Sequence, residues 1–405
     1  MVNIAVLGYG TVGSGVVEVL NTNRDSISKK AGTEINIKYV LDLREFPGDP
    51  VMEVLVHDYD IILNDPEVKV VVEVMGGVNP AYKFVKAALE SGKSVCTSNK
   101  ELVAKHGAEL LEIARQKNIN FLFEASVGGA IPIIRPLNQS LTADEIEEIT
   151  GILNGTTNYI LSKMSNEGSD FDTVLKDAQN KGYAERNPEA DVEGYDACRK
   201  IAILSSLAFG MQVDYEDIYT EGITKVTDTD IKYAKSLGAS IKLFGTSRKE
   251  EEKVFACVTP VMINANHPLY SVNDVFNGIY VRGNVLGDVM FYGSGAGKLP
   301  TASAVMADVI DAVKHLGTNI MTIWSNKKLQ LADFNKASFR YFVRLNASDV
   351  SVKEEVAKVF GQVTEVTAEG VAGEYAFITE EMTEEAFNEK VSQFDNFISR
   401  IRVRF

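Results

Sequence analysis

The 405-residue chain lacks several features that would point to particular classes of protein. It has no uninterrupted run of about 18 apolar residues, the length of a membrane-spanning helix. Its amino terminus predicts a strand and has no basic stretch before an apolar segment, so we expect no secretion signal. The net charge of −15 has the wrong sign for binding nucleic acid or an anionic membrane. We therefore expect a cytoplasmic protein with a small-molecule substrate and no nucleic-acid or membrane partner.

Cysteine and histidine are also scarce. Cys96, Cys198 and Cys257 are odd in number and far apart, which argues against a disulfide framework or a structural zinc site. The four histidines lie in no recognisable catalytic motif. The apolar content of 45% and the charged content of 24% are ordinary for a globular protein, and the length allows two or three domains.

A glycine-rich loop near the start of the chain is the most informative local motif. Residues 3–7 predict a strand, residues 12–20 predict a helix, and a G-x-G-x-x-G motif lies between them. Gly8 permits a tight turn, Gly10 lets the backbone approach a pyrophosphate, and Gly13 lets the helix pack close to the strand. The helix N-terminus offers amide hydrogens and a positive dipole end to the phosphates. The motif predicts NAD or NADP as the cofactor, bound by Gly8, Gly10, Thr11, Val12 and Gly13.

The following residues alternate between strand and helix signals. Strands are predicted at 34–41, 68–74, 94–97 and 120–124, and helices at 80–91 and 101–117. This alternation is typical of an α/β fold with a Rossmann-type parallel sheet, which binds its ligand at the carboxyl ends of the strands. Ser98 and Lys100 follow one such strand. A cation is poorly placed at a helix N-terminus, so a functional role for Lys100 gains weight.

Asp42 and Arg44 follow the second predicted strand, where a dinucleotide-binding domain holds the adenine ribose. An aspartate at this place favours NAD, because it accepts hydrogen bonds from the ribose hydroxyls. An arginine accommodates the additional phosphate of NADP. Both residues are present, so the sequence leaves the choice of cofactor open.

Residues 181–210 combine acidic side chains with a predicted helix. Glu185 and Asp191 precede Asp196 and Lys200, which are four residues apart and so share one face of the helix. Taken alone, such a pair is most often a solvated surface pair. Beside a dinucleotide site it has another use, because hydride addition to a carbonyl needs a cation and a proton donor at the oxygen.

The remaining sequence predicts two further domains. Residues 137–300 mix helices, one of them at 228–243, with antiparallel strands, which indicates an α+β domain on an open mixed sheet. A loop containing Gly295 and Gly297 enters a helix at 301–316, and we expect this helix to return to the first domain and the loop to close over the cofactor. Residues 338–405 predict the ferredoxin-like order βαββαβ. The predicted domains are therefore 1–130 with 301–320, 131–300, and 338–405.

Several motifs together resemble those of the homoserine dehydrogenase family. They lie at residues 8–13, 98–100, 124–132, 151–158 (G-I-L-N-G-T-T-N), 182–200 and 293–303. The tail at 338–405 is similar to the ACT regulatory module. The resemblance implies reversible, NAD(P)-dependent interconversion of L-homoserine and L-aspartate 4-semialdehyde in threonine, methionine and isoleucine biosynthesis. It also implies that 131–300 is a catalytic and dimerisation domain and that the chain forms a homodimer or homotetramer.

The same resemblance implies roles for individual residues. Lys200 would donate the proton, and Lys100 would lie between cofactor and substrate. Glu185, Asp191 and Asp196 would bind the substrate. A monovalent cation, Na⁺ or K⁺, would be held by the backbone of Glu124, Val127, Gly129 and Ile131.

The chain departs from the family pattern at three places. Asp42 follows leucine where an Arg-Asp pair is frequent, which weakens the case for NADP. Asp349 and Val350 stand near a Pro-Gly position of the ACT module, which puts ligand binding by the tail in doubt. Lys298 replaces a frequent glycine and would bring a positive charge near the cofactor.

Two alternative functions use parts of the same pattern. An aspartate-semialdehyde dehydrogenase would need a nucleophilic cysteine with a histidine partner, which no cysteine here offers in its sequence context. An NAD(P)-binding, amino-acid-sensing regulator without catalytic activity would need no lysine beside the nicotinamide. The acid-and-lysine pattern of residues 185–200 therefore favours the enzyme.

Overall fold

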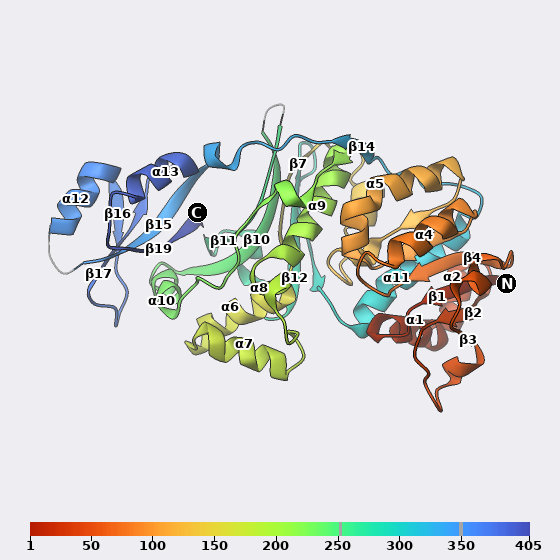
Figure 1. Cartoon of the computed structure of the whole chain (residues 1–405). Helices are drawn as coiled ribbons and strands as arrows, with labels where there is room; N and C mark the ends of the chain where they lie inside the picture. Colours follow the sequence, from red (N-terminus) through yellow and green to blue (C-terminus); the bar gives the residue numbers. More distant parts are fainter. Residues whose placement is uncertain (251–252, 348–350) are drawn as a thin grey trace. The chain divides into compact units, whose positions relative to one another are not determined.

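The computed structural model describes residues 1–250, 253–347 and 351–405 (Figure 1). They form two compact units. Unit 1 comprises Met1–Glu145, Ala202–Tyr215 and Gly293–Leu329, and unit 2 comprises Ile146–Ile201, Glu216–Tyr292 and Gln330–Phe405. Within the described residues, no helix combines the length and apolarity needed to cross a membrane.

Unit 1 is built on a six-stranded parallel sheet in the order β3-β2-β1-β4-β5-β6. The strands are β1 (Val2–Leu7), β2 (Ile35–Leu41), β3 (Leu55–Val56), β4 (Val68–Glu73), β5 (Ser94–Thr97) and β6 (Phe121–Leu122). The chain order reverses between β1 and β4, where a doubly wound sheet binds its ligand. The predicted Rossmann-type sheet is confirmed.

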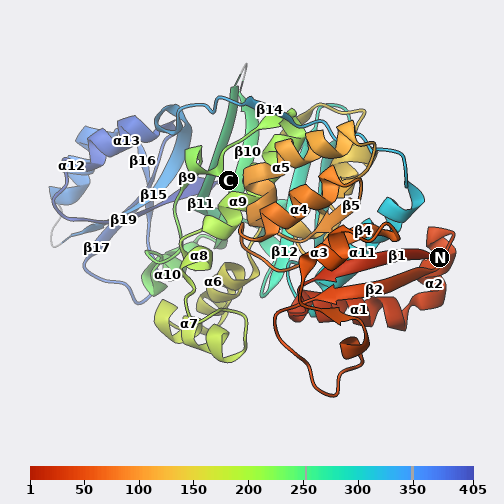
Figure 2. The same ribbon diagram turned by 45° about the vertical axis from the view of Figure 1, so that its right-hand side comes forward.

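Helices cover both faces of this sheet (Figure 2). They are α1 (Thr11–Thr22), α2 (Arg24–Ala31), α3 (Tyr59–Leu63), α4 (Ala81–Glu90), α5 (Lys100–Gln116) and α11 (Lys298–Lys314). Val16 of α1 and Val305 of α11 share one core with Ile4 and Val72 of the sheet, so both helices cover the same face. The predicted return of the late helix to the first unit is confirmed. A pair of short strands, β8 (Met211–Gln212) and β14 (Ser325–Lys328), completes the unit.

Unit 2 contains one mixed sheet in the order β13-β12-β7-β10-β11-β19-β15-β17-β16. Its strands are β7 (Ile146–Ile152), β9 (Tyr219–Thr220), β10 (Ala239–Glu250), β11 (Lys253–Asn264), β12 (Phe276–Gly283), β13 (Gly287–Ser294), β15 (Ser338–Asn346), β16 (Val363–Val366), β17 (Glu374–Thr379), β18 (Met382–Thr383) and β19 (Phe397–Arg404). Its helices are α6 (Gly155–Glu167), α7 (Phe171–Asn180), α8 (Glu189–Val192), α10 (Asp228–Ser236), α12 (Ser351–Phe360), α13 (Glu384–Val391) and the first part of α9 (Tyr195–Phe209), whose residues from Ala202 on belong to unit 1. The open mixed sheet predicted for the catalytic region is confirmed.

The C-terminal elements follow the predicted order βαββαβ. They share the sheet of unit 2, because β19 pairs in parallel with β11 through Val261 and Arg402. The structure thus has two compact units where the sequence predicts three domains, and the exact domain boundaries and the likeness to an ACT module stay predictions. The departure at Asp349 and Val350 lies outside the described residues.

The prediction of one helix over 228–243 is wrong in its second half. Helix α10 begins with a capping box, in which Thr227 and Asp230 exchange hydrogen bonds, and it ends at Ser236. Gly238 has a φ of +64°, a left-handed conformation that ends a helix readily. Strand β10 begins at Ala239 and pairs along its length with β11. Pairing with the neighbouring strand outweighs local helix preference here.

His267 caps a short 3-10 helix, Pro268–Ser271, beside the sheet of unit 2. Its Nδ1 accepts the N–H of Leu269 at 3.2 Å, and its ring lies 5.2 Å from that of Phe244. An acceptor nitrogen must be unprotonated. Burial, together with the charge of Arg404, lowers the pKa of His267 to about 4.

This depressed pKa predicts a contribution to acid unfolding. An unfolded histidine takes up its proton near pH 6.5, whereas the folded chain takes it up only near the lower pKa, so stability should fall as pH drops through that interval. His267→Asn keeps an acceptor for the Leu269 amide but does not titrate. We expect the Tm of this variant to fall less steeply with acidification, measured by thermal unfolding between about pH 7 and about pH 4.5. Parallel Tm curves for the two proteins would contradict the assignment.

Candidate active site

The glycine loop after β1 has the geometry expected of a dinucleotide site. Gly8 has a φ of +99°. A Cβ on Gly13 would lie 1.9 Å from the carbonyl oxygen of Gly8, so only glycine lets α1 start this close to the loop. A Cβ on Gly10 would meet nothing within 4 Å, which shows open space in front of the helix start. Thr11 and Val12 form the uncapped first turn of α1, where amide hydrogens suit phosphate oxygens.

Asp42 and Arg44 lie together at the carboxyl end of β2. Asp42 accepts the backbone N–H of Tyr9 at 2.8 Å, and Arg44 donates to both of its carboxylate oxygens at 3.0 and 2.9 Å. These hydrogen bonds, that of the Arg44 side chain first, hold the pKa of Asp42 well below its usual range. Both residues line a cavity of about 500 Å³ whose walls include Leu41, Met75 and Phe84. An ionised acceptor at the rim of an apolar cavity suits an adenosine.

The neighbouring strand ends of β4 and β5 are tied together by Glu73, which the sequence analysis did not identify. Thr97 donates to Glu73 at 2.6 Å, and the amide of Asn99 donates to the carbonyl of Gly77 at 2.6 Å. Burial raises the pKa of Glu73. Asn99 also caps α5 by accepting the N–H of Leu102, which fixes the half-buried first residue of that helix.

That first residue is Lys100, directly after Ser98 and Asn99. The structure thus places both predicted residues, Ser98 and Lys100, at the carboxyl edge of the parallel sheet. This is the edge that carries the glycine loop of β1. The loop before Lys100 is held by Glu73, so its position is fixed by a buried side chain.

A second glycine contact joins the loop at 124–131 to the loop before α11. A Cβ on Gly129, whose φ is +56°, would lie 2.5 Å from the carbonyl oxygen of Gly295, and Ala130 donates its N–H to Ser294 at 3.1 Å. Gly297, with a φ of +128°, directly precedes α11. The Lys298 ammonium lies 2.7 Å from Glu18 of α1. Its expected charge near the cofactor is therefore partly neutralised.

The predicted cation loop has a fixed backbone and buried carbonyl groups. The Glu124 carboxylate accepts the backbone N–H groups of Ile133, Ile134 and Arg135 at 2.6, 2.9 and 2.8 Å. Val127 and Gly129 are buried. Across the described part of the chain, no hydrogen bond accepted by the backbone oxygen of either residue is found. Hard cations take oxygen ligands, so the backbone oxygens of this buried loop are of the kind that the predicted ion would need.

Unit 2 contains the predicted acid-and-lysine cluster. The Lys200 ammonium donates to Asp196 at 2.7 Å and to the backbone oxygen of Leu153, at the end of β7, at 2.8 Å. Asp196 is 2% and Lys200 8% exposed. This burial excludes the solvated surface pair that the spacing alone would favour. The amide of Asn154 donates to Asp196 at 2.8 Å and to Asp191 at 2.7 Å, so two carboxylates converge on one asparagine, and Lys200 joins them through Asp196.

Asn154 is a site residue that the sequence analysis quoted in a motif but did not assign. Its side-chain oxygen accepts the N–H of Thr157 at 2.8 Å and so caps α6. Because the oxygen is used by the helix, the amide hydrogens must face the carboxylates. Glu185, by contrast, lies on an exposed loop, where its backbone oxygen accepts from Gln179 at 3.1 Å. The structure brings Asp191, Asp196 and Lys200 together and leaves the Glu185 side chain exposed.

The cysteines do not offer a nucleophile. All three are buried and unpaired by disulfides. Burial raises the pKa of Cys96 and of Cys198, and it raises the pKa of Cys257 to about 11. A nucleophilic cysteine needs a lowered pKa, so the cysteine chemistry of a semialdehyde dehydrogenase is not supported.

Comparison with known proteins identifies the family. Residues 132–310 match the family model of homoserine dehydrogenase, and residues 8–124 match that of the homoserine dehydrogenase NAD binding domain. Homoserine dehydrogenase of Mycobacterium tuberculosis is 40% identical over 420 residues, covering 98% of this chain and 94% of that protein. The crystal structure of a homoserine dehydrogenase from Thiobacillus denitrificans has a TM-score of 0.91 at 34% identity and covers 100% of this chain and 98% of that one.

A further solved structure, a hyperthermophilic archaeal homoserine dehydrogenase in complex with NADPH, has a TM-score of 0.65 at 28% identity. It covers 77% of this chain and 97% of that one. These matches confirm the resemblance drawn from the motifs and do not favour a non-catalytic regulator. The chain therefore belongs to the homoserine dehydrogenase family and is an NAD(P)-binding oxidoreductase of that family.

Proposed function

We propose that this chain interconverts L-homoserine and L-aspartate 4-semialdehyde with Lys200 as the proton donor and acceptor. The observation that carries this assignment is the buried Lys200 ammonium, fixed between Asp196 and the oxygen of Leu153 at 2.7 and 2.8 Å. Two acceptors fix its position, and little water competes with it. Such a group is ready to give a proton to an oxygen on which charge develops.

A single residue, Lys200, accounts for the proton that the reaction consumes or releases at the substrate oxygen. The bound nicotinamide supplies a hydride to the aldehyde carbon and accepts it back in the reverse direction. As the carbonyl oxygen gains negative charge, the Lys200 ammonium gives it a proton and becomes neutral. In homoserine oxidation, the neutral amine takes the hydroxyl proton. Lys100 assists by its charge.

The acidic residues hold the amino group of the substrate. Asp191 and Asp196 present carboxylates that the Asn154 amide orients, and an ammonium group pairs well with carboxylates in such a partly dry site. Glu185 approaches from its exposed loop and completes the binding of the amino group when substrate is present.

The cofactor is NAD or NADP. Asp42 accepts hydrogen bonds from the ribose hydroxyls of NAD. Arg44, whose side chain is 63% exposed, turns from Asp42 to the additional phosphate of NADP. The matched NAD binding domain model supports NAD, and the archaeal relative solved in complex with NADPH supports NADP. A monovalent cation, Na⁺ or K⁺, would be held by the backbone of Glu124, Val127, Gly129 and Ile131, in the loop that contacts Gly295.

The chain works as a homodimer or homotetramer in the cytoplasm. The edge strand β13 and its hairpin expose large apolar side chains, among them Val285, Met290 and Tyr292, which an oligomer would cover. The three cysteines are buried and form no disulfide among the described residues, which suits a reducing compartment.

Replacing Lys200 tests the proton donor. We expect Lys200→Ala to lower kcat by roughly 10²- to 10⁴-fold in both directions, the usual contribution of a general acid or base. Binding of NAD(P)H should persist, measured by fluorescence titration. Lys232→Ala is the matched control, since Lys232 forms the same i,i+4 pair with Asp228 but on an exposed helix surface. A near-normal rate for Lys200→Ala would show that another group moves the proton.

Replacing Arg44 tests the cofactor assignment. We expect Arg44→Ala to raise KM for NADP by roughly tenfold or more, because a charge-assisted hydrogen bond to phosphate is lost. KM for NAD should change little, since Asp42 keeps the N–H of Tyr9. Lys298→Ala is the companion variant. A larger effect of Lys298→Ala on NADP than of Arg44→Ala would move the phosphate site to α11.

A further inference from the structure

We propose that Glu221 is a positioning residue for the substrate loop, and that two arginines of the last strand, Arg400 and Arg402, hold it in place. Glu221 lies in unit 2 and acts on the substrate loop, defined here as residues 189–194, which contains the short helix α8 and carries Asp191. The inference rests on the proposed role of Asp191 in binding the substrate.

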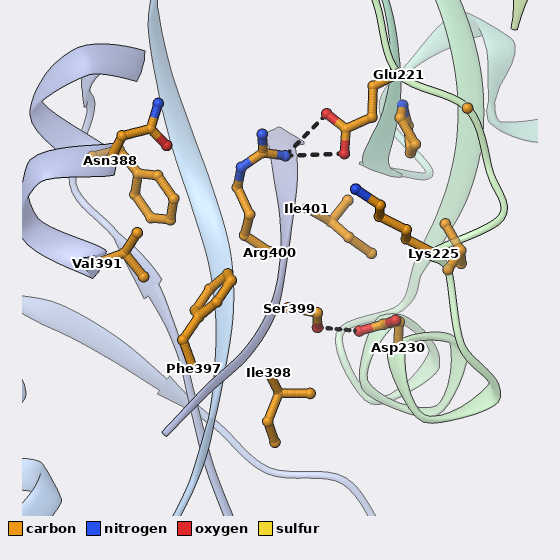
Figure 3. A pocket seen from close by; sticks show the side chains of 14 residues that line it. Glu221, Lys225, Asp230, Asn388, Val391, Phe397, Ile398, Ser399, Arg400 and Ile401 are labelled. Atoms are coloured by element: carbon orange, nitrogen blue, oxygen red, sulfur yellow. Dashed lines mark hydrogen bonds and ion pairs between the residues drawn. The ribbon is translucent and has the colours of Figure 1, made fainter. Parts of the chain in front are cut away.

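Glu221 is bound by both arginines. The Arg400 guanidinium donates to its two carboxylate oxygens at 3.1 Å each, and Arg402 donates to one of them at 2.8 Å. Figure 3 shows Glu221 and Arg400 facing one another from different parts of the chain. Burial opposes the charge of Glu221, but the two arginines outweigh it and lower its pKa. Glu221 is therefore ionised and fixed by two cations.

The arginines are themselves held rigidly. Glu384, which is 2% exposed, accepts from Arg400 at 3.0 Å, from Arg402 at 2.8 Å and from the Tyr341 hydroxyl at 2.8 Å. Two carboxylates and two guanidinium groups thus form a closed network. Its arginines stand on alternate residues of β19 and so project from the same face of that strand. A network with this many shared bonds has one preferred geometry.

The backbone around Glu221 lies directly against the substrate loop. A Cβ on Gly222 would be 2.2 Å from the carbonyl oxygen of Val192, and Ile223 donates its N–H to that same oxygen at 2.8 Å. On the other side, a Cβ on Gly194 would lie 3.2 Å from the side chain of Thr220. Backbones in contact at this distance leave no room for one to move without the other.

Backbone hydrogen bonds connect the substrate loop to the acidic residues. Asp191 is the residue before Val192, and its backbone oxygen accepts the N–H of Gly194 at 3.0 Å. Gly194 in turn accepts the N–H of Cys198 at 2.9 Å, in the first turn of α9, which also carries Asp196. A displacement of Glu221 therefore moves Asp191 relative to Asn154.

On one side, Glu221 faces a cavity rather than packed side chains. Glu221, Lys225, Phe397 and Arg400 all line a cavity of about 470 Å³. Figure 3 shows these side chains around that space. The direction of the carboxylate is therefore set by its hydrogen bonds, from the two arginines and from the Tyr219 hydroxyl, which donates to one of its oxygens at 3.3 Å.

Glu221→Gln removes the charge and keeps the shape. We expect this variant to raise KM for homoserine about tenfold, because the aspartates lose their alignment. KM for the cofactor should stay within about twofold of that of the unchanged enzyme, since unit 1 holds the dinucleotide. Glu221→Asp, which keeps the charge, should recover part of the loss, and it serves as the folded variant if the glutamine variant is unstable.

Glu148→Gln is the matched control. The Glu148 side chain is 9% exposed, against 20% for Glu221, and it pairs at 2.6 Å with Arg404, the next arginine on the same face of β19, in a pair that does not include the loop at 220–223. Its KM for homoserine should not change. An equal rise in both variants would show general destabilisation and overturn the proposal.

A double-mutant cycle separates this inference from the proposed function. If Glu221 acts through Asp191, Asp191→Asn with Glu221→Gln should raise KM for homoserine no further than Asp191→Asn alone. Additive effects, or an unchanged KM in Glu221→Gln beside a raised KM in Asp191→Asn, would overturn the positioning role. An unchanged KM in Asp191→Asn would overturn the substrate-binding role of Asp191, and this inference with it.

Discussion

The buried ion pair of Lys200 and Asp196 is the constraint on which the catalytic unit depends. Taking two charges out of water costs several kcal/mol for each ion, and their attraction offsets this only when the remaining hydrogen-bonding groups are also satisfied. Here the carbonyl of Leu153 and the amide of Asn154 supply the additional hydrogen bonds. The end of β7, the cap of α6 and the first turns of α9 must therefore meet at one point, and this meeting places Lys200, the proposed proton donor.

The dinucleotide-binding unit depends on a different constraint: close backbone contacts at glycines rather than buried charge. Its ligand has phosphates that need amide hydrogens, so backbone must come close to backbone around the open space in front of α1. The backbone at Gly13 lies so close to Gly8, and that at Gly129 so close to Gly295, that a Cβ atom at either glycine would clash. Substitution there would displace whole loops, whereas substitution in the acid-and-lysine cluster would unbalance charge. The two halves of the reaction are thus sensitive to different kinds of change.

The sequence predicted the parts of the site whose signals are local. The glycine loop follows its strand directly, and Asp196 and Lys200 are one helical turn apart, so both patterns were visible before any folding. Asn154 and Glu221 were not assigned, because their partners are distant in sequence: Asn154 meets Asp196 across 42 residues, and Glu221 meets Arg400 across 179. The failed helix prediction at 228–243 has the same origin, since the pairing of β10 with β11 overrides local preference. The family resemblance assigned many site residues that local sequence patterns could not. It did not predict the contacts of the last strand.

Through those contacts the last strand supports the catalytic unit, although the sequence of the strand itself contains no motif that indicates this. Arg400, Arg402 and Arg404 each reach an acid outside β19, and one of these acids, Glu221, lies in the segment that contacts the substrate loop. Removing the arginines would leave buried carboxylates without their cations, which costs more than the pairs themselves contribute. The energetic penalty would fall on the catalytic segments, although the substitution is in the C-terminal strand. The pairing of β19 with β11 therefore joins the C-terminal elements to the site by charge as well as by backbone hydrogen bonds.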